Sequence, residues 1–310
     1  MLDYLVSLSV FAGLYALLAL GLNLVWGLGG MVNLGLAGLF AIGAYVSALA
    51  ELGWHLPLAA AAALALLVAA GAGALLAVVT ARLKGDYLAI VTLGFAEVIQ
   101  LLAANEVWLT NGTDGLAGIP APGRGQLSSL QFDLAAAGVV WLVIILTALV
   151  LRRLSQAPYG RVLRAIREDE TVATVAGKRV LRFKVSAFAV GSGVMGLAGS
   201  LYAAYDGYVA PDSFDVLVTL LVVLALTAGG LGSMAGAVLG SVLVVALTEG
   251  TRFLGGLLPW LSALQVASLR QAVIGAFLLL LLRIRPEGIL PERRRLHRLE
   301  AAREADNATT

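Results

Sequence analysis

Residues 4–26 read YLVSLSVFAGLYALLALGLNLVW, a continuous run without a single Asp, Glu, Lys or Arg. A helix needs about 20 apolar residues to cross the hydrocarbon core of a bilayer. Backbone polar groups must be paired inside the hydrocarbon, so only helices and closed barrels cross it. Barrel strands are short and alternate in polarity, whereas this run is long and uninterrupted. The stretch therefore predicts a membrane-spanning helix.

The composition of the whole chain extends this prediction to nearly all of the protein. Of its 310 residues, 60% are hydrophobic and only 13% are charged, whereas a soluble protein has about half and about a quarter. The mean hydropathy is +0.93. These values exclude a soluble globular chain, a disordered chain, a collagen-like repeat and a disulfide-rich secreted domain. We predict an all-α, polytopic transmembrane bundle.

Eight more apolar runs follow the first, which gives nine expected spans. The N-terminal residues Met1 to Tyr4 carry no positive charge and the first run is too long for a cleaved signal, so we expect an uncleaved first helix. Glycines between the first two spans leave room for a broken or re-entrant helix. The expected spans are 4–26, 31–51, 56–81, 87–104, 133–151, 184–205, 214–230, 234–254 and 269–284.

Lys and Arg residues are distributed very unequally between the two sides of these spans. Counting Arg124, Arg252 and Arg270 on one side leaves 18 of the 21 basic residues on the other. Cytoplasmic loops of membrane proteins carry the excess of basic residues. We therefore predict an external N-terminus and a cytoplasmic C-terminus. Residues 1–285 are expected to form one membrane domain, and residues 286–310 a cytoplasmic tail.

Two glycine clusters, residues 27–30 and 228–232, interrupt the apolar runs on the predicted cytoplasmic side. Interrupted helices at corresponding positions of two halves often mark the binding site of a transporter. Few polar side chains lie within the spans. Glu97 either forms a hydrogen bond to a neighbouring helix as a neutral carboxyl or contacts a polar group of the substrate, such as an ammonium. The candidate polar residues of a pathway are Asn23, Asn33, Glu97 and Gln100.

The chain lacks the residues that most other functions require. It has no Cys and only two His, far apart in the sequence. No thiolate metal site, HExxH zinc motif or Ser nucleophile with His partners can therefore be assembled. Val172 stands where a phosphate-binding loop ending at Lys178 would need Gly. A proton-driven transporter would need more buried ionisable groups. We therefore expect no enzyme activity, metal, cofactor or nucleic acid, and any energy for transport must enter through another chain.

Residues 158–178 have the pattern of a docking helix. Pro158 and Gly160 mark the start, Gly177 suits the end, and apolar residues recur every three or four positions in between. We predict one amphipathic helix of about four turns, in which Arg164 pairs with Glu168 and Arg167 with Glu170.

The acidic centre of this segment argues against simple binding to anionic lipid, which favours Lys and Arg. We therefore expect the helix to enter a cleft in a soluble partner; the alternative is a solvated connecting helix that rests on the membrane. The expected contact residues are Arg161, Arg164, Ile166, Arg167, Glu168, Asp169 and Glu170.

Several blocks of the chain resemble the branched-chain amino acid ABC permeases, in order and over nearly the whole length. The similarity is closest to the longer of the two permease types of this family. Leu36 stands where the family often has His, and urea and short-amide permeases share much of the pattern, so these substrates remain the alternative. The blocks are Ala19 to Gly27, Asn33 to Tyr45, Lys84 to Glu97, Thr110 to Pro120, Gly160 to Glu170, Leu226 to Gly236 and Arg285 to Leu290.

The resemblance implies a type II ABC importer-like permease of the bacterial inner membrane. It would pair with a second, shorter permease around a pathway for leucine, isoleucine and valine. Two cytoplasmic ATPase subunits would bind the coupling helix at Arg161 to Ala176, and a periplasmic binding protein would deliver the amino acid.

The connection 105–132 would contact that binding protein or close the outer gate; the alternative is an ordinary turn-rich loop. Its candidate contact residues are Thr110, Asn111, Gly112, Thr113, Asp114 and Gly115.

Overall fold

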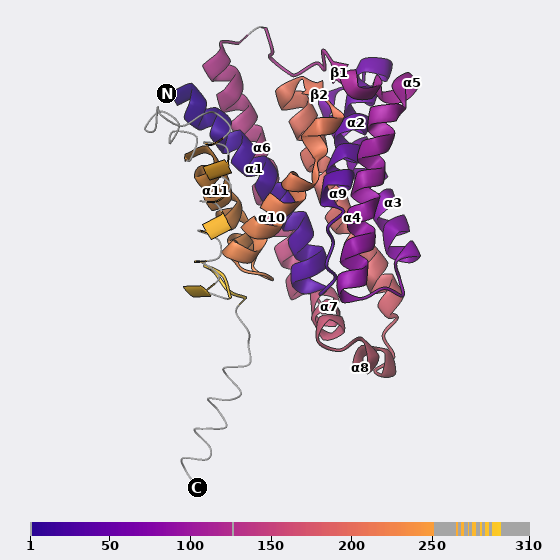
Figure 1. The fold of residues 1–310 in the computed structure, drawn as a ribbon. Coiled ribbons are helices and arrows are strands. Elements are labelled where there is room, and N and C mark those ends of the chain that lie inside the picture. The colour runs from indigo at the N-terminus through magenta and orange to yellow at the C-terminus, as the bar shows by residue number, and fades with distance from the viewer. Residues whose placement is uncertain are drawn as a thin grey trace.

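The computed structural model describes residues 2–125 and 127–250, and a few residues of the C-terminal part, among them 287–292. Within this part the chain is a bundle of helices, as predicted (Figure 1). Its long helices are α1 (Leu2–Leu22, continued by a π-helical turn, Asn23–Leu28), α2 (Leu36–Trp54), α3 (Leu58–Val79), α4 (Gly85–Asn105), α6 (Ser129–Gln156), α9 (Val180–Asp206), α10 (Val216–Gly229) and α11 (Met234–Gly250).

Short elements cap the bundle at its two ends. One end carries α5 (Val107–Thr110) and a two-stranded antiparallel sheet of β1 (Leu116–Ala117) and β2 (Tyr208–Val209), in which Leu116 pairs with Val209. The opposite end carries α7 (Pro158–Glu168) and α8 (Glu170–Val175) (Figure 1). We call these the α5 end and the α7–α8 end.

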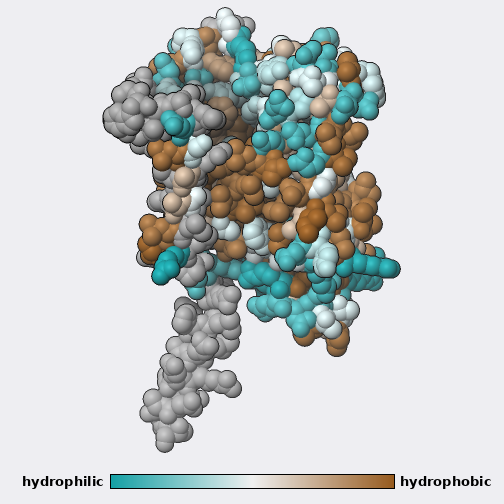
Figure 2. Space-filling view, in the orientation of Figure 1, coloured by the Kyte–Doolittle hydropathy of each residue, from teal (hydrophilic) through white to brown (hydrophobic). Residues whose placement is uncertain are grey.

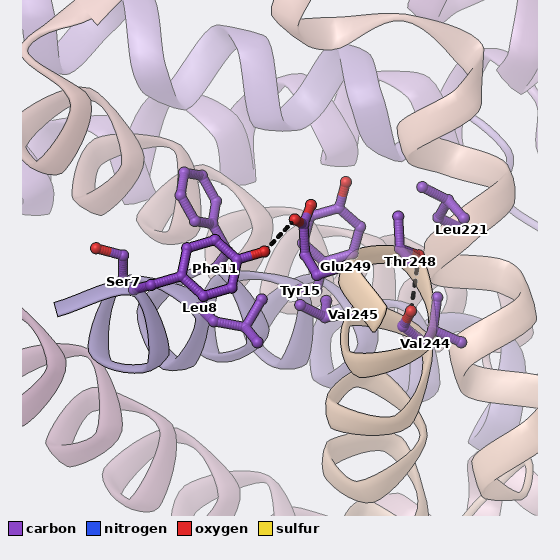
Figure 3. Close-up of a pocket in the computed structure, with 10 residues that line it drawn as sticks. Ser7, Leu8, Phe11, Tyr15, Leu221, Val244, Val245, Thr248 and Glu249 are labelled. Carbon is purple, nitrogen blue, oxygen red and sulfur yellow. Dashed lines mark hydrogen bonds between the residues drawn. The ribbon is translucent and has the colours of Figure 1, made fainter. Parts of the chain in front are cut away.

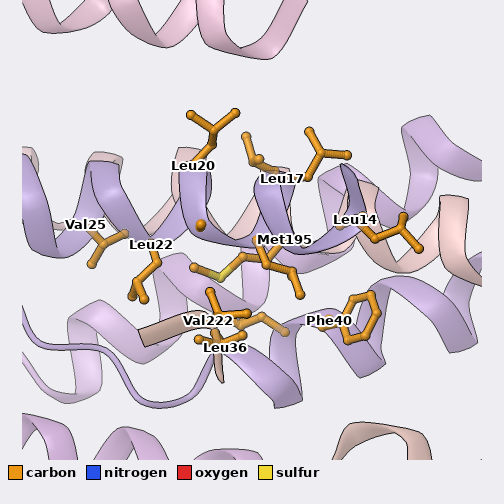
Figure 4. Close-up of a cluster of buried hydrophobic side chains, with 14 of the residues drawn as sticks. Leu14, Leu17, Leu20, Leu22, Val25, Leu36, Phe40, Met195 and Val222 are labelled. Atoms are coloured by element: carbon orange, nitrogen blue, oxygen red, sulfur yellow. The ribbon is translucent and has the colours of Figure 1, made fainter. Parts of the chain in front are cut away.

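Helices α9 and α2 form the centre of the bundle. In their most apolar stretches 78% and 72% of the residues are buried, against 22% in α4 and 17% in α6. Small residues allow this close packing: a Cβ on Gly43 of α2 would lie 2.6 Å from the carbonyl carbon of Gly196 in α9. Side chains of α1, α2, α9 and α10 meet in the same interior, as Leu22, Leu36, Met195 and Val222 do in Figure 4.

The outer helices present large apolar side chains to the surroundings. Val79, Ile90 and Val150 are 72%, 66% and 63% exposed, and Figure 2 shows a hydrophobic belt between two hydrophilic ends. A belt of this kind matches the hydrocarbon of a bilayer. Seven helices in the described part of the chain are long and apolar enough to cross it.

Several expected spans need corrections at their ends. The fifth is Ser129–Gln156 and not 133–151, and the sixth begins at Val180 and not at residue 184. The second begins at Leu36 and not at residue 31, because residues 29–35 are not helical. Gly is a poor helix former, and the Asn33 side-chain oxygen accepts a hydrogen bond from the N–H of Gly35, two residues further on. The seventh begins as a helix at Val216, after a 3₁₀ turn at Pro211–Phe214. The eighth, α11, is described from Met234 to Gly250. The ninth, 269–284, lies largely outside the described residues, so the total of nine remains a prediction.

Candidate functional site

A break in the first helical hairpin places polar groups inside the bundle. After the π-helical turn the chain runs without helix from residue 29 to residue 35. Non-helical backbone at membrane depth needs partners from the protein. The N–H of Leu34 donates to Thr92 Oγ1 (3.0 Å), its carbonyl accepts from Thr219 Oγ1 (3.4 Å), and Gly35 donates to Asn33 Oδ1 (2.9 Å). These three polar side chains are fully buried. Buried side chains therefore hold the non-helical backbone of the break in a defined position.

A second break, residues 230–233 between α10 and α11, contacts the first through Asn23. The side-chain oxygen of Asn23 accepts from the N–H of Gly232 at 2.8 Å, and its Nδ2 donates to Met234 Sδ at 3.5 Å. The two glycine clusters singled out in the sequence therefore lie together in the structure. Asn23 joins the two interrupted hairpins.

The four predicted pathway residues fall into two groups. Asn23 and Asn33 are buried at the breaks, and Asn33 Nδ2 is a buried donor without a partner in the described part of the chain. Gln100 of α4 donates to the carbonyl of Pro211 (3.2 Å), before α10. Glu97, one turn earlier, is half-buried and has no hydrogen bond or ion pair among the described residues.

Thr92 and Thr219 hold the first break in place, and sequence analysis missed both. The only available signal was a threonine within an apolar helix. That signal is weak, because such hydroxyls commonly bond to the carbonyl one turn back in their own helix, as Thr92 does to Ala89 (3.0 Å).

A cavity of about 190 Å³ lies between α1, α10 and α11 (Figure 3). Glu249 points into it, and its Oε2 accepts a hydrogen bond from the hydroxyl of Tyr4 at 2.7 Å. Much of the remaining lining is apolar, with Phe11 and Leu221 among its residues. This carboxylate near the end of a span therefore has a protein partner, in contrast to Glu97.

The predicted docking helix is two helices, so the continuous four-turn helix was wrong. Asp169 has extended backbone angles (φ −153°, ψ 111°) and ends α7. Its carboxylate accepts the N–H groups of Val172 (3.1 Å) and Thr171 (2.7 Å), and so caps α8. These two backbone hydrogen bonds lower the pKa of Asp169.

The predicted pairs Arg164–Glu168 and Arg167–Glu170 are also wrong. Two carboxylates instead bridge two cations each. Glu170 binds Lys184 Nζ (2.8 Å) and Lys84 Nζ (2.9 Å), and Glu292 binds Arg164 Nε (2.9 Å) and an Nη atom of Arg167 (2.9 Å). Burial alone would raise the pKa of Glu170, but hydrogen bonds from Lys184 and Lys84 outweigh it and lower the pKa. Tertiary contacts thus hold α7 and α8.

Only some of the predicted docking residues face outward. Ile166 is 6% exposed and packs with Ala173 and Val180, whereas Arg161, Glu168 and Asp169 are exposed. The structure adds two residues that sequence analysis had not assigned to the docking surface: Val172 and Val175 of α8 are 65% and 85% exposed. Apolar side chains exposed at a polar end of a protein often mark a contact site.

The predicted outer-loop residues form a tight turn at the α5 end. Thr110 is buried and its hydroxyl donates to the carbonyls of Ala103 (2.7 Å) and Glu106 (2.9 Å). Asn111 has a left-handed backbone (φ 62°), and its Nδ2 donates to the carbonyl of Gly115 (3.0 Å). Gly112 and Gly115 are buried. The side chains of this turn exposed to a partner are those of Asn111, Thr113 and Asp114.

Comparison with known proteins identifies relatives over most of the chain. A family model described as the permease component of the branched-chain amino acid transport system matches residues 4–282. The high-affinity branched-chain amino acid transport permeases LivM of Salmonella typhimurium and Escherichia coli are each 33% identical over 92% of this chain and 70% of their own. LivH of Salmonella typhimurium is 28% identical over 89% of this chain and 91% of its own. No solved structure matches.

Proposed function

Because the chain belongs to the branched-chain amino acid transport permease family, we propose that it forms the membrane pathway for leucine, isoleucine and valine in an ATP-driven importer. It is a transport subunit and a multi-pass protein of the inner membrane. The observation that carries the proposal is a single family match from residue 4 to residue 282. Relatives of both permease types, LivM and LivH, support its pairing with a second permease.

We assign the α7–α8 end to the contact with two ATPase subunits, which would hydrolyse the ATP. Three features support this assignment. Helix α8 has an N-cap of its own, and its exposed Val172 and Val175 offer an apolar contact in a polar surface. The Glu170 cluster fixes the base of α8, and the Glu292 cluster holds α7. A motion imposed on α8 would therefore reach the bundle.

We assign the breaks and Glu97 to the pathway. Glu97 lies about 18 Å along α4 from its first residue, at a rise of about 1.5 Å per residue, and therefore deep in a helix of 21 residues. A charged carboxylate at that depth has a high free-energy cost if it faces the acyl chains of the lipid. The second permease or the ammonium group of an amino acid would give Glu97 the partner that the described residues do not.

At the α5 end, Asn111, Thr113 and Asp114 would receive a periplasmic binding protein. The turn that carries them is rigid, because Thr110 and Asn111 bond to the backbone on either side. Rigidity reduces the entropic cost of binding a partner.

ATP-dependent uptake by the complete complex tests the proposal. The chain would be reconstituted in proteoliposomes with its second permease, both ATPases and the binding protein, and uptake of radiolabelled leucine measured. We expect uptake to require ATP and the binding protein, and to be reduced by excess isoleucine or valine but not by urea or acetamide.

Other results would contradict specific parts of the proposal. Leucine uptake without ATPase subunits would indicate a secondary transporter. If urea or acetamide reduced the uptake and isoleucine and valine did not, the substrate would be urea or a short amide and not a branched-chain amino acid. The substrate needs this direct test because the family is broad: a permease named for autoinducer 2 import, LsrC of Salmonella paratyphi B, is 27% identical over 61% of this chain and 54% of its own.

A further inference from the structure

A short segment of the C-terminal part, Glu287–Glu292, is bound along the end of α10. The N–H of Ile289 donates to the carbonyl of Ala228, and that of Leu290 to the carbonyl of Gly229, both at 2.9 Å. The last carbonyls of a helix have no partner within the helix. This segment supplies that partner and is thereby fixed beside the second break.

Glu292, at the end of this segment, also binds α7. Its Oε1 accepts from Arg164 Nε and its Oε2 from Arg167, each at 2.9 Å. The Glu292 side chain is 17% exposed, and those of Arg164 and Arg167 are 33% and 22% exposed. Arg164 further donates to the carbonyl of Ser155 (3.0 Å), and Arg167 to the carbonyl of Gly27 in the π-helical turn. We call Glu292, Arg164 and Arg167 the tail triad.

The tail triad touches both breaks. Gly30 has φ +70°, and a Cβ there would lie 2.6 Å from Arg167 Cγ. A Cβ on Gly232 would lie 2.7 Å from Glu292 Oε2. Glycine at these two positions therefore lets the triad pack directly against the backbone of each break. A displacement of α7 relative to the bundle cannot leave the two breaks unaffected while the triad is intact.

We propose that Glu292 is a positioning residue for energy coupling: its carboxylate holds Arg164 and Arg167 so that movement of α7 is transmitted to the breaks at residues 29–35 and 230–233. This inference rests on the proposed function, because it assumes that α7 and α8 receive the motion of the ATPases. The Glu170 cluster fixes the base of α8 to Lys84 and Lys184. The tail triad is the connection from α7 to the broken hairpins.

The first test compares transport with ATP hydrolysis in the same proteoliposomes of the complete complex. For Glu292→Gln we expect leucine uptake per complex to fall roughly tenfold while ATP hydrolysis stays within about twofold, so that more ATP is used per leucine. Glu292→Asp keeps the charge but is shorter, and should recover part of the uptake. The matched control is Glu287→Gln, in the same segment with an exposed side chain, which should behave as the parent. If uptake and hydrolysis fall together and their ratio stays unchanged, the proposal is overturned.

The second test uses the full chain alone in detergent and needs neither substrate nor ATPase. Loss of the Glu292 carboxylate should release α7 from the C-terminal segment. The rate of trypsin cleavage within α7 should then be roughly tenfold higher in Glu292→Gln than in Glu287→Gln. Equal rates in the two variants would overturn the proposal. If the parent complex moved no leucine, the proposed function would fail while this cleavage test still reported on the triad, so the two failures are distinguishable.

Discussion

Carboxylates in and around the membrane differ in whether the protein supplies a partner. Glu170 and Glu292 each bridge two cations, and Glu249 accepts a hydrogen bond from Tyr4. Glu97 has no hydrogen bond or ion pair within the described part of the chain. An ionisable group inside a membrane protein usually faces a cavity or a partner. At the residue scale, Glu97 is therefore the first candidate for a contact made only in the assembled, working complex.

Replacement of Glu97 by Gln should lower leucine uptake about tenfold, because the side chain keeps its size but loses the charge that attracts an ammonium. The measurement is leucine uptake by proteoliposomes that contain equal amounts of assembled complex. The control is Glu106→Gln, at the end of the same helix, where the carboxylate accepts from Trp108 Nε1. Uptake within about twofold of the parent would indicate a neutral, structural carboxyl at position 97.

Sequence analysis identified many of the polar residues at these sites, but not their partners. Asn23 and Asn33 were expected within the spans. Both are buried, Asn23 in the π-helical turn that continues α1 and Asn33 in the break before α2. Asn23 binds Gly232, 209 positions away, and Arg164 binds Glu292, 128 positions away. A sequence displays only the local pairs of a helix, three or four residues apart. Pairs between residues far apart in the sequence depend on how the helices pack, and the periodicity of the sequence does not reveal that packing.

At the scale of elements, α7 and α8 show how one residue changes a helix. The residues Glu168 and Glu170 fit a continuous helix, and apolar periodicity predicted one. Asp169 between them is a strong N-cap residue, and in the structure it ends α7 and starts α8. Val172 and Val175 of the resulting α8 are exposed. Apolar spacing therefore predicted helix in this segment, but not its division into two helices, and the docking role stays a prediction.

A charge at the tip of α8 should prevent docking of the ATPases. Val175→Asp places a carboxylate at an 85% exposed apolar position, where burial against a partner would desolvate it. We expect the amount of ATPase that co-purifies with the permease to fall about tenfold or more. The control is Val107→Asp, the same change at a 65% exposed residue of α5, which should retain the ATPase. Equal co-purification of both variants would exclude α8 as the contact.

At the scale of the whole molecule, two interrupted hairpins are packed beside a continuous centre. Helices α2 and α9 are largely buried and packed through glycines, whereas Asn23, in the π-helical turn before the break at residues 29–35, binds Gly232 of the break at 230–233. A packed centre resists deformation, so a change of shape between inward-open and outward-open states is expected to occur at the breaks. The glycine clusters located them in the sequence, while their contact with each other depended on the fold.

The placement of the whole bundle in the membrane gives the last prediction. Positive charge gathers at the α7–α8 end, whereas Arg124 lies in the connection at the α5 end, so the α7–α8 end should be cytoplasmic. The chain has no cysteine, so single cysteines can be placed at Thr113 and Val175 and labelled with a membrane-impermeant maleimide. We expect Thr113→Cys to react in intact spheroplasts, and Val175→Cys only after permeabilisation.

The termini test the number of spans in the same assay. Tyr4, in the first turn of α1, binds Glu249 near the end of α11, whereas Glu292 binds Arg164 at the α7–α8 end. Glu249 precedes the expected ninth span, 269–284, in the sequence and Glu292 follows it. The two residues make their contacts at opposite ends of the bundle. Nine spans require that Asp3→Cys reacts from outside and Thr310→Cys only after permeabilisation. Reaction of both cysteines from the same side would mean an even number of spans and would rule out nine.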